Sequence, residues 1–159
     1  RLTMSETMDV LKKVGYQLPK ERKGDLDPGG ERAVAEYVKK EFNNEFFYLI
    51  DWPISVRPFY HMRHPDNPEL TRSFDLIAGG LEIATGAQRE HRYDVLKKQA
   101  LEYGLGLESI QFYLDFFRYG CPPHGGFGMG LSRLLMVLLK LPNIREAVYL
   151  FRGPNRLHP

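Results

Sequence analysis

The chain has 159 residues, of which 43% are hydrophobic and 13% aromatic, a composition that excludes a disordered chain and suffices for one domain with a sizeable core. Its formal net charge of +2 is too small to establish nucleic-acid binding by itself. A single cysteine, Cys121, excludes an internal disulfide framework and fits a reducing compartment. Because no apolar stretch is long enough to cross a bilayer and no signal peptide is recognisable, we expect a cytoplasmic protein without membrane contact.

Residue 1 is an arginine and not a methionine, so we expect the chain to be a piece of a longer protein.

The first part of the chain predicts two helices. A helix is expected from Ser5, as its N-cap, to about Val14, because apolar side chains recur there at helical spacing. A second helix is expected from Glu31 to Phe42, with four side chains buried along one face: Val34, Tyr37, Val38 and Phe42.

Residues 46–54, FFYLIDWPI, form a dense run of β-forming side chains. This run predicts an internal strand that Pro53 interrupts, since proline cannot donate a ladder hydrogen bond. Asp51 and Trp52 lie near the end of the strand, where they either face a functional site or serve as a turn cap and a core residue.

The next segment, residues 57–71, contains three prolines and two histidines. His61 and His64 are not accompanied by a cysteine or a third histidine, which argues against a zinc site. We therefore expect a loop on the substrate side of the protein.

A β-hairpin is predicted over residues 73–84. Two runs, 73–78 and 81–84, are separated by Gly79 and Gly80, which can take the positive φ values of a tight turn. Side chains alternate along a strand, so the second run is expected to show Glu82 and Ala84 on one face and Leu81 and Ile83 on the other.

The end of this hairpin carries an acid, a hydroxyl and an arginine. Glu82, Thr85 and Arg89 lie at spacings of three and four residues. Together they indicate a small polar site at the end of a packed strand. The alternative is that Glu82 and Arg89 are surface residues that form a weak, exposed ion pair.

Two amphipathic helices are expected after the hairpin, over residues 91–104 and 108–119. The second carries four aromatic side chains at helical spacing, which we expect to pack in the core on the back of the sheet and not to stack on bases: Phe112, Tyr113, Phe116 and Phe117.

Residues 120–133, GCPPHGGFGMGLSR, form a glycine-rich turn that leads into an apolar helix ending at about Lys140. Glycine-rich backbone before a helix lets N–H groups approach an anion, and Arg133 in the first turn adds a fixed charge. The alternative is a tight packing joint. Asn143 is expected to cap the segment after this helix, and residues 147–151 are expected to form a last strand.

Two segments together resemble a known family. GLEIATGAQREHRYDVL and YGCPPHGGFGMGLSRLL are similar to the carboxy-terminal half of the catalytic domain of aspartyl-tRNA synthetases of the archaeal type. GFGMGLSRL, within about residues 125–140, resembles motif 3 of class II synthetases. The resemblance implies an α+β fold with a central antiparallel sheet flanked by helices. It also implies that residues 1–159 lack the anticodon-binding OB-fold and motifs 1 and 2.

The activity that the resemblance implies is an aspartate–tRNA ligase, which uses ATP to activate L-aspartate as aspartyl-adenylate and transfers it to tRNA(Asp), and to tRNA(Asn) in non-discriminating members. The family is homodimeric, and we expect the 159-residue chain alone to be inactive. Two other classes remain open. One is an asparagine-synthetase-like adenylating paralogue, and the other is a non-catalytic module derived from a synthetase.

The resemblance assigns the metal side of the site to the hairpin. Glu82 is implied to bind a Mg²⁺ ion that bridges the ATP phosphates, with Asp75 on the partner strand as a second acid. Thr85 stands where the family usually has serine, so its hydroxyl is implied to contact both the metal and the aspartate side of the site.

The resemblance also assigns the substrate contacts. Arg89 is implied to bind the side-chain carboxylate of aspartate, with Gln88 and Gly86 shaping the same pocket. Arg133 is implied to bind the γ-phosphate. The nucleotide is implied to lie along the preceding backbone, formed by Gly130, Leu131 and Ser132. His124 either touches substrate or has a structural role.

Overall fold

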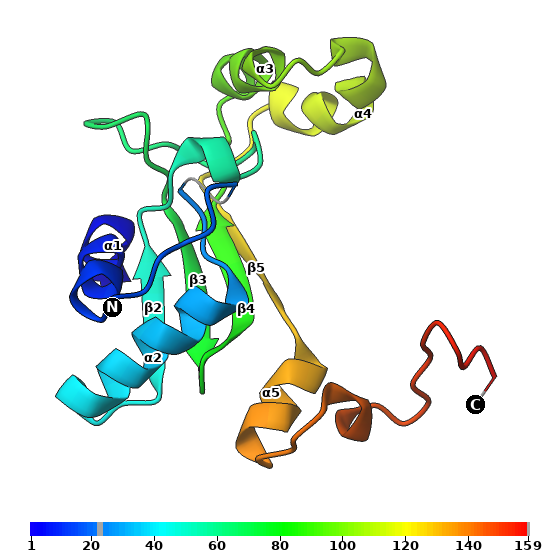
Figure 1. Cartoon of the computed structure of the whole chain (residues 1–159). Coiled ribbons are helices and arrows are strands. Elements are labelled where there is room, and N and C mark those ends of the chain that lie inside the picture. The colour runs from blue at the N-terminus through cyan, green and yellow to red at the C-terminus, as the bar shows by residue number, and fades with distance from the viewer. Residues whose placement is uncertain (22–23, 159) are drawn as a thin grey trace.

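The computed structural model describes residues 1–21 and 24–158 and is built on one five-stranded sheet with the order β1-β2-β3-β4-β5 (Figure 1). β1 pairs with β2 in parallel, and every other pair is antiparallel. The predicted α+β fold with a central, mostly antiparallel sheet is therefore confirmed. The strands are β1 (Leu2–Thr3), β2 (Phe46–Ile50), β3 (Ser73–Ala78), β4 (Leu81–Gln88) and β5 (Gly125–Met129).

The predicted hairpin is formed by β3 and β4, with Gly79 and Gly80 at φ values of +57° and +78°. β4 continues to Gln88, beyond the predicted end at residue 84. Between the pairs Leu76↔Ala84 and Ile77↔Glu82 the register shifts, which leaves one extra residue in β4. Such a bulge shifts the alternation of side chains along the strand. The prediction that Glu82 and Ala84 share a face is therefore wrong, because their partners Ile77 and Leu76 are adjacent in β3 and face opposite sides.

Helix α1 (Met4–Lys13) packs on β1 and β2, and helix α2 (Pro28–Phe42) packs on β3 and β4 (Figure 1). The core between them contains ten buried apolar side chains: Met4, Val10, Leu11, Leu26, Val34, Val38, Phe47, Leu49, Trp52 and Ile77. Val34 and Val38 are buried as predicted, whereas Phe42 is 63% exposed at the end of α2, so its predicted burial is wrong.

The first two helices begin earlier than predicted because their caps lie upstream. Thr3, and not Ser5, caps α1: the Glu6 N–H donates to Thr3 Oγ1 at 3.2 Å and the Thr3 N–H donates to Glu6 Oε2 at 2.7 Å. Asp27 caps α2 by accepting from the Gly30 N–H at 3.0 Å, so the helix starts at Pro28 and not at Glu31.

The strand predicted over residues 46–54 ends at Ile50 because Asp51 adopts a left-handed conformation with φ of +58°. A 3₁₀ helix, η1 (Ile54–Val56), takes the place of its last part. Trp52 is only 3% exposed, in agreement with the core alternative for this side chain.

Helices α3 (Tyr93–Glu102) and α4 (Leu107–Arg118) pack on each other beyond one end of the sheet (Figure 1). Leu96, Leu114 and Phe117 are buried between them. Phe112 and Phe116 are 72% and 74% exposed, so the prediction that they belong to a core behind the sheet is wrong. They lie on the face of α4 opposite the one that contacts α3.

The glycine-rich segment forms β5, which was expected to be a turn, followed by α5 (Leu131–Leu138). Asn143 caps the 3₁₀ helix η2 (Ile144–Ala147) as predicted, because its Oδ1 accepts from the Arg145 N–H at 3.0 Å. The strand predicted over residues 147–151 is not formed. In the described part of the chain, no strand pairs with this segment.

Two glycines of the sheet offer a matched test of its packing. A Cβ on Gly86 in β4 would lie 2.7 Å from atoms of Phe74 and Phe127, whereas a Cβ on Gly128 in β5 would meet nothing within 4 Å. We expect Gly86→Ala to lower the free energy of unfolding by about 1 to 3 kcal/mol through overpacking. Gly128→Ala should leave it unchanged or raise it by about 0.5 kcal/mol. Urea unfolding checks this, and equal effects of the two substitutions would contradict the packing seen here.

Candidate functional site

Three oxygen-bearing side chains share one face of the β3–β4 hairpin. Asp75 in β3 is the direct partner of Thr85 in β4, so the two side chains point to the same side. In a regular strand Glu82 and Thr85, three residues apart, would face opposite sides. The bulge at Ile83 reverses this, and Glu82 pairs with Ile77 on the same face as Asp75.

Two arginines bring positive charge to these oxygens. Arg57, which follows η1, donates from Nη2 to Asp75 Oδ2 at 2.5 Å and from Nη1 to Thr85 Oγ1 at 3.3 Å. Arg133 lies in the first turn of α5, as predicted. Its Nη1 donates to the main-chain oxygen of Glu82 at 2.8 Å and lies 3.7 Å from Glu82 Oε1.

A third carboxylate reaches the site from the first turn of α2. Glu31 Oε2 accepts from the Glu82 N–H at 3.3 Å. Burial raises the pKa of both Glu31 and Glu82, and the negative charge of Asp75 raises both pKa values further. Arg133 partly offsets this effect at both groups. Around Asp75 and Glu82, three carboxylates therefore lie near two arginines, Arg57 and Arg133, which leaves this part of the site with an excess of acidic groups.

The oxygen set suits a magnesium ion better than a metal that needs a complete protein cage. Among residues 1–21 and 24–158, no group of three or more His, Cys, Asp and Glu side chains has the arrangement of a metal site. Mg²⁺ is typically held by one or two carboxylates together with waters and substrate phosphates. Asp75 fits this pattern, since its Oδ1 is buried and receives no hydrogen bond from any described residue.

Arg89 lies at the end of β4 on the same face as Thr85. Its guanidinium carbon is 4.9 Å from the centre of the Tyr60 ring, and its Nη2 donates to the Gly126 carbonyl at 3.4 Å. A Cβ on Gly126 would stand 3.4 Å from Arg89 Nε, so a glycine in β5 makes room for this side chain. Within the described residues no carboxylate pairs with Arg89, which leaves it able to bind an acidic ligand.

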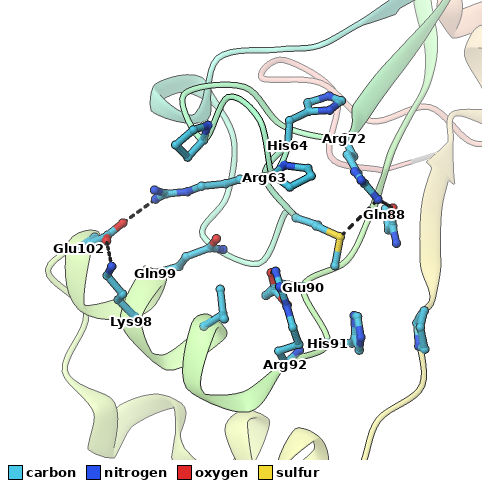
Figure 2. Close-up of a pocket in the computed structure, with 15 residues that line it drawn as sticks. Arg63, His64, Arg72, Gln88, Glu90, His91, Arg92, Lys98, Gln99 and Glu102 are labelled. Atoms are coloured by element: carbon cyan, nitrogen blue, oxygen red, sulfur yellow. Dashed lines mark hydrogen bonds and ion pairs between the residues drawn. The ribbon is translucent and has the colours of Figure 1, made fainter.

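Gln88 is not brought together with Arg89, although it was expected in the same pocket. Side-chain alternation places it on the opposite face of β4, where its Oε1 accepts from Arg72 Nη1 at 2.8 Å. Gln88 and Arg72 line a hollow of about 460 Å³ beside α3. Figure 2 shows these two side chains next to each other. Gly86 also belongs to this opposite face, because it fits between Phe74 and Phe127.

The charges around that hollow are largely paired with one another. Glu90 is fully buried and accepts from Arg92 Nη2 at 2.8 Å, and Glu102 accepts from Arg63 at 2.6 Å (Figure 2). These pairs fasten the end of β4 and the loop before β3 to α3. The hollow therefore has a structural explanation and does not include the site face.

The backbone that the sequence predicts to line a nucleotide lies at the junction between β5 and α5. The Gly130 N–H donates to the Ile83 carbonyl at 2.8 Å, which ties the start of α5 to the bulge in β4. Leu131 and Ser132 then open the helix, and their N–H groups belong to its first turn, where intrahelical acceptors are absent. The Leu131 side chain is 66% exposed, so only its backbone suits a role in the site.

Sequence reasoning did not name Arg57, Glu31 or Tyr60 as site residues, although Arg57 and Tyr60 lie in the loop that was expected on the substrate side. All three come from segments that are distant in the chain from the hairpin, so no local spacing relates them to Glu82. His124 is half-buried and stacks on Phe117 at a ring distance of 6.0 Å, which supports its structural alternative.

Comparison with known proteins assigns the family. The family described as tRNA synthetases class II (D, K and N) matches residues 1–152. The chain belongs to this family. Such an assignment agrees with the geometry, because the matched segment carries the hairpin, β5 and the first turn of α5.

One similar protein is an Aspartate–tRNA(Asp/Asn) ligase of Aeropyrum pernix. It is 46% identical to this chain, and the match covers 100% of this chain and 38% of that protein. An Aspartate–tRNA(Asp) ligase of Thermococcus kodakarensis is 43% identical over 100% of this chain and 36% of that protein. The chain thus spans little more than a third of the length of these relatives.

Solved structures of class II members are similar to this chain over its full length. An aspartyl-tRNA synthetase from Entamoeba histolytica has a TM-score of 0.94 and 36% identity, covering 100% of this chain and 32% of that one. An asparaginyl-tRNA synthetase from Pyrococcus horikoshii, complexed with asparaginyl-adenylate, has a TM-score of 0.88 and 35% identity, covering 100% and 36%. Fold similarity alone therefore does not separate the aspartate from the asparagine branch.

No helix in the described part of this class II chain is long and apolar enough to cross a membrane.

His61 gives the site region a titratable marker. It is 4% exposed, and burial, followed by the charges of Arg89 and Arg57, lowers the pKa of its imidazole to about 4 from the usual 6.5. The unfolded chain therefore binds a proton that the folded protein excludes until about pH 4. The resulting stability is complete above about pH 6.5 and is lost as the pH falls towards 4.

We expect His61→Phe to remove most of this pH dependence. Between pH 7 and pH 4, the wild-type protein should lose about 3 kcal/mol more of its free energy of unfolding than the variant. Urea unfolding of both proteins at several pH values measures this difference. The raised pKa values of Glu31 and Glu82 have the opposite effect on stability, but they are present in both proteins and cancel when the two are compared. Parallel curves for the two proteins would contradict a buried, neutral His61.

Proposed function

We propose that the protein containing this chain is an aspartate–tRNA ligase, which activates L-aspartate with ATP and transfers it to tRNA(Asp), and also to tRNA(Asn) if it is non-discriminating. The observation that carries the proposal is that Glu82, Thr85 and Arg89 lie on one face of β4, with Arg133 at Glu82. The names of the relatives support the same activity.

The residues of the shared face divide into an ATP side and an aspartate side. Glu82, Asp75 and Thr85 are proposed to hold Mg²⁺, which when bound offsets the charge of the ATP phosphates. Arg133 is proposed to bind the γ-phosphate from the first turn of α5, and the backbone at Gly130 to Ser132 lines the nucleotide. Preorganised positive charge of this kind lowers the barrier to attack on a polyphosphate.

Arg89 is proposed to select aspartate. A planar guanidinium pairs bidentately with a carboxylate, whereas a carboxamide offers one acceptor and is neutral. The ring of Tyr60 and the Gly126 carbonyl hold the guanidinium at the edge of the sheet. Thr85 lies between Arg89 and Glu82 on the same face of β4, directly opposite Asp75. Gln88 is left out of this set because it faces the other side of β4.

The reaction needs no nucleophilic side chain or general base from this chain. The α-carboxylate of aspartate attacks the α-phosphorus of ATP, the bond to the β-phosphate oxygen breaks, and pyrophosphate leaves. A ribose hydroxyl of the tRNA then attacks the acyl carbon and releases AMP. The groups that bind the α-phosphate and the tRNA are expected in the remaining part of the protein, so the 159-residue chain alone is proposed to be inactive.

Two further features are proposed from the resemblance. A homodimer is supported by exposed apolar side chains on β5 and α5, such as Phe127 at 66% and Leu138 at 57% exposure. A cytoplasmic location is supported by the single free cysteine and by a relative, the Aspartate–tRNA ligase 2, cytoplasmic, of Arabidopsis thaliana, which is 43% identical.

ATP–pyrophosphate exchange on the protein produced from its complete gene tests this proposal. We expect exchange with aspartate and not with asparagine, and a loss of at least roughly a hundredfold in Arg89→Leu, because a charge-assisted bidentate contact is removed. Arg118→Leu is the matched control. Arg118 also lies over a tyrosine ring, that of Tyr119, but it stands at the end of α4, away from the site face.

Equal exchange by wild type and Arg89→Leu would contradict the role of Arg89. Exchange that depends on asparagine would instead favour the asparagine branch. Exchange with aspartate but no transfer to tRNA would indicate an asparagine-synthetase-like paralogue, and exchange with neither amino acid would indicate a non-catalytic module.

A further inference from the structure

We propose that Arg57 is a positioning residue for the divalent cation, and that it orients the Asp75 carboxylate so that one oxygen is kept for the ion. This inference rests on the proposed metal site at Asp75, Glu82 and Thr85. It adds a residue from outside the hairpin and the glycine-rich segment.

The two oxygens of Asp75 have different surroundings. Oδ2 accepts from Arg57 Nη2 at 2.5 Å, whereas Oδ1 is buried and receives no hydrogen bond from the described residues. The Asp75 side chain is only 4% exposed, so bulk water has little access to it. Leaving a buried carboxylate oxygen unpaired is unfavourable, and a bound cation removes that cost.

Arg57 is itself held rigidly enough to orient its neighbour. Its side chain is 12% exposed, and its guanidinium carbon lies 4.0 Å from the centre of the Trp52 ring, which is buried. The second arm of the fork donates to Thr85 Oγ1 at 3.3 Å. One planar guanidinium therefore holds both the Asp75 carboxylate and the Thr85 hydroxyl. A lysine ammonium lacks this fixed fork of donors.

Two effects of Arg57 on a bound cation have opposite signs. Its positive charge repels a divalent ion, which alone would make the ion bind more tightly once Arg57 is removed. Its hydrogen bonds hold the ligand oxygens in place, and partners of this kind commonly change metal affinity by roughly 10- to 100-fold. The buried, unpaired Oδ1 favours the second effect, because the hydrogen bond of Arg57 to Oδ2 leaves this one oxygen without a protein partner.

The test is Mn²⁺ binding, followed by the electron paramagnetic resonance of the free ion. It uses the protein produced from its complete gene, with a non-hydrolysable ATP analogue. We expect Arg57→Met to weaken Mn²⁺ binding by roughly 10- to 100-fold. Arg57→Lys, which keeps the charge but loses the fork, should lose most of the same affinity. Arg72→Met is the matched control, because the Arg72 side chain forms hydrogen bonds with Gln88 and Met62, away from the acids. The Mn²⁺ affinity of this variant should stay within about twofold of the wild-type affinity.

The outcomes separate this inference from the proposed function. If wild type binds no Mn²⁺, or Asp75→Asn binds it as tightly as wild type does, the metal site is rejected and the role of Arg57 with it. If Asp75→Asn loses the ion while Arg57→Met binds it equally or more tightly, only the role of Arg57 is overturned. Near-ultraviolet circular dichroism establishes that each variant is folded, and if Arg57→Met does not fold, Arg57→Lys decides alone.

Discussion

Side-chain alternation along β4, reset once at Ile83, is the constraint on which the candidate site depends. Without the extra residue, Glu82 would face the side of the sheet opposite Thr85. With it, an acid, a hydroxyl and an arginine from eight consecutive positions reach one face. The same alternation sends Gln88 to the other face, into the contacts that hold α3.

Charge balance then explains which other elements meet this face. Burial and mutual repulsion raise the pKa of Glu31 and Glu82, so the acids need neighbouring cations. Arg133 reaches Glu82 because the Gly130 N–H bonds to the bulge and fixes the start of α5. Arg57 directly follows η1, and its guanidinium lies over the Trp52 ring, from where it reaches Asp75. The bulge therefore determines both the acid cluster and the place where one arginine arrives.

The sequence predicted the hairpin, the five helices and the family, because the two glycines of the turn, helical periodicity and motif 3 are local signals. It did not predict β5, since glycines disfavour strands and only the ladder with β4 stabilises this one. Nor did it predict the exposure of Phe112 and Phe116, because periodicity identifies an apolar face but not its partner. The loop at residues 57–71 was expected on the substrate side, but the role of Arg57 was not, because its contacts are 18 and 28 residues away in the chain and leave no local pattern.

The most direct measurement is a crystal structure of the protein produced from its complete gene, bound to a non-hydrolysable analogue of aspartyl-adenylate. We expect the side-chain carboxylate of the analogue to form two hydrogen bonds with Arg89 on the Thr85 face of β4, and the adenosine to lie towards α5. A carboxylate bound at Arg72 and Gln88, on the opposite face, would contradict the assignment of the site to the face that the bulge creates.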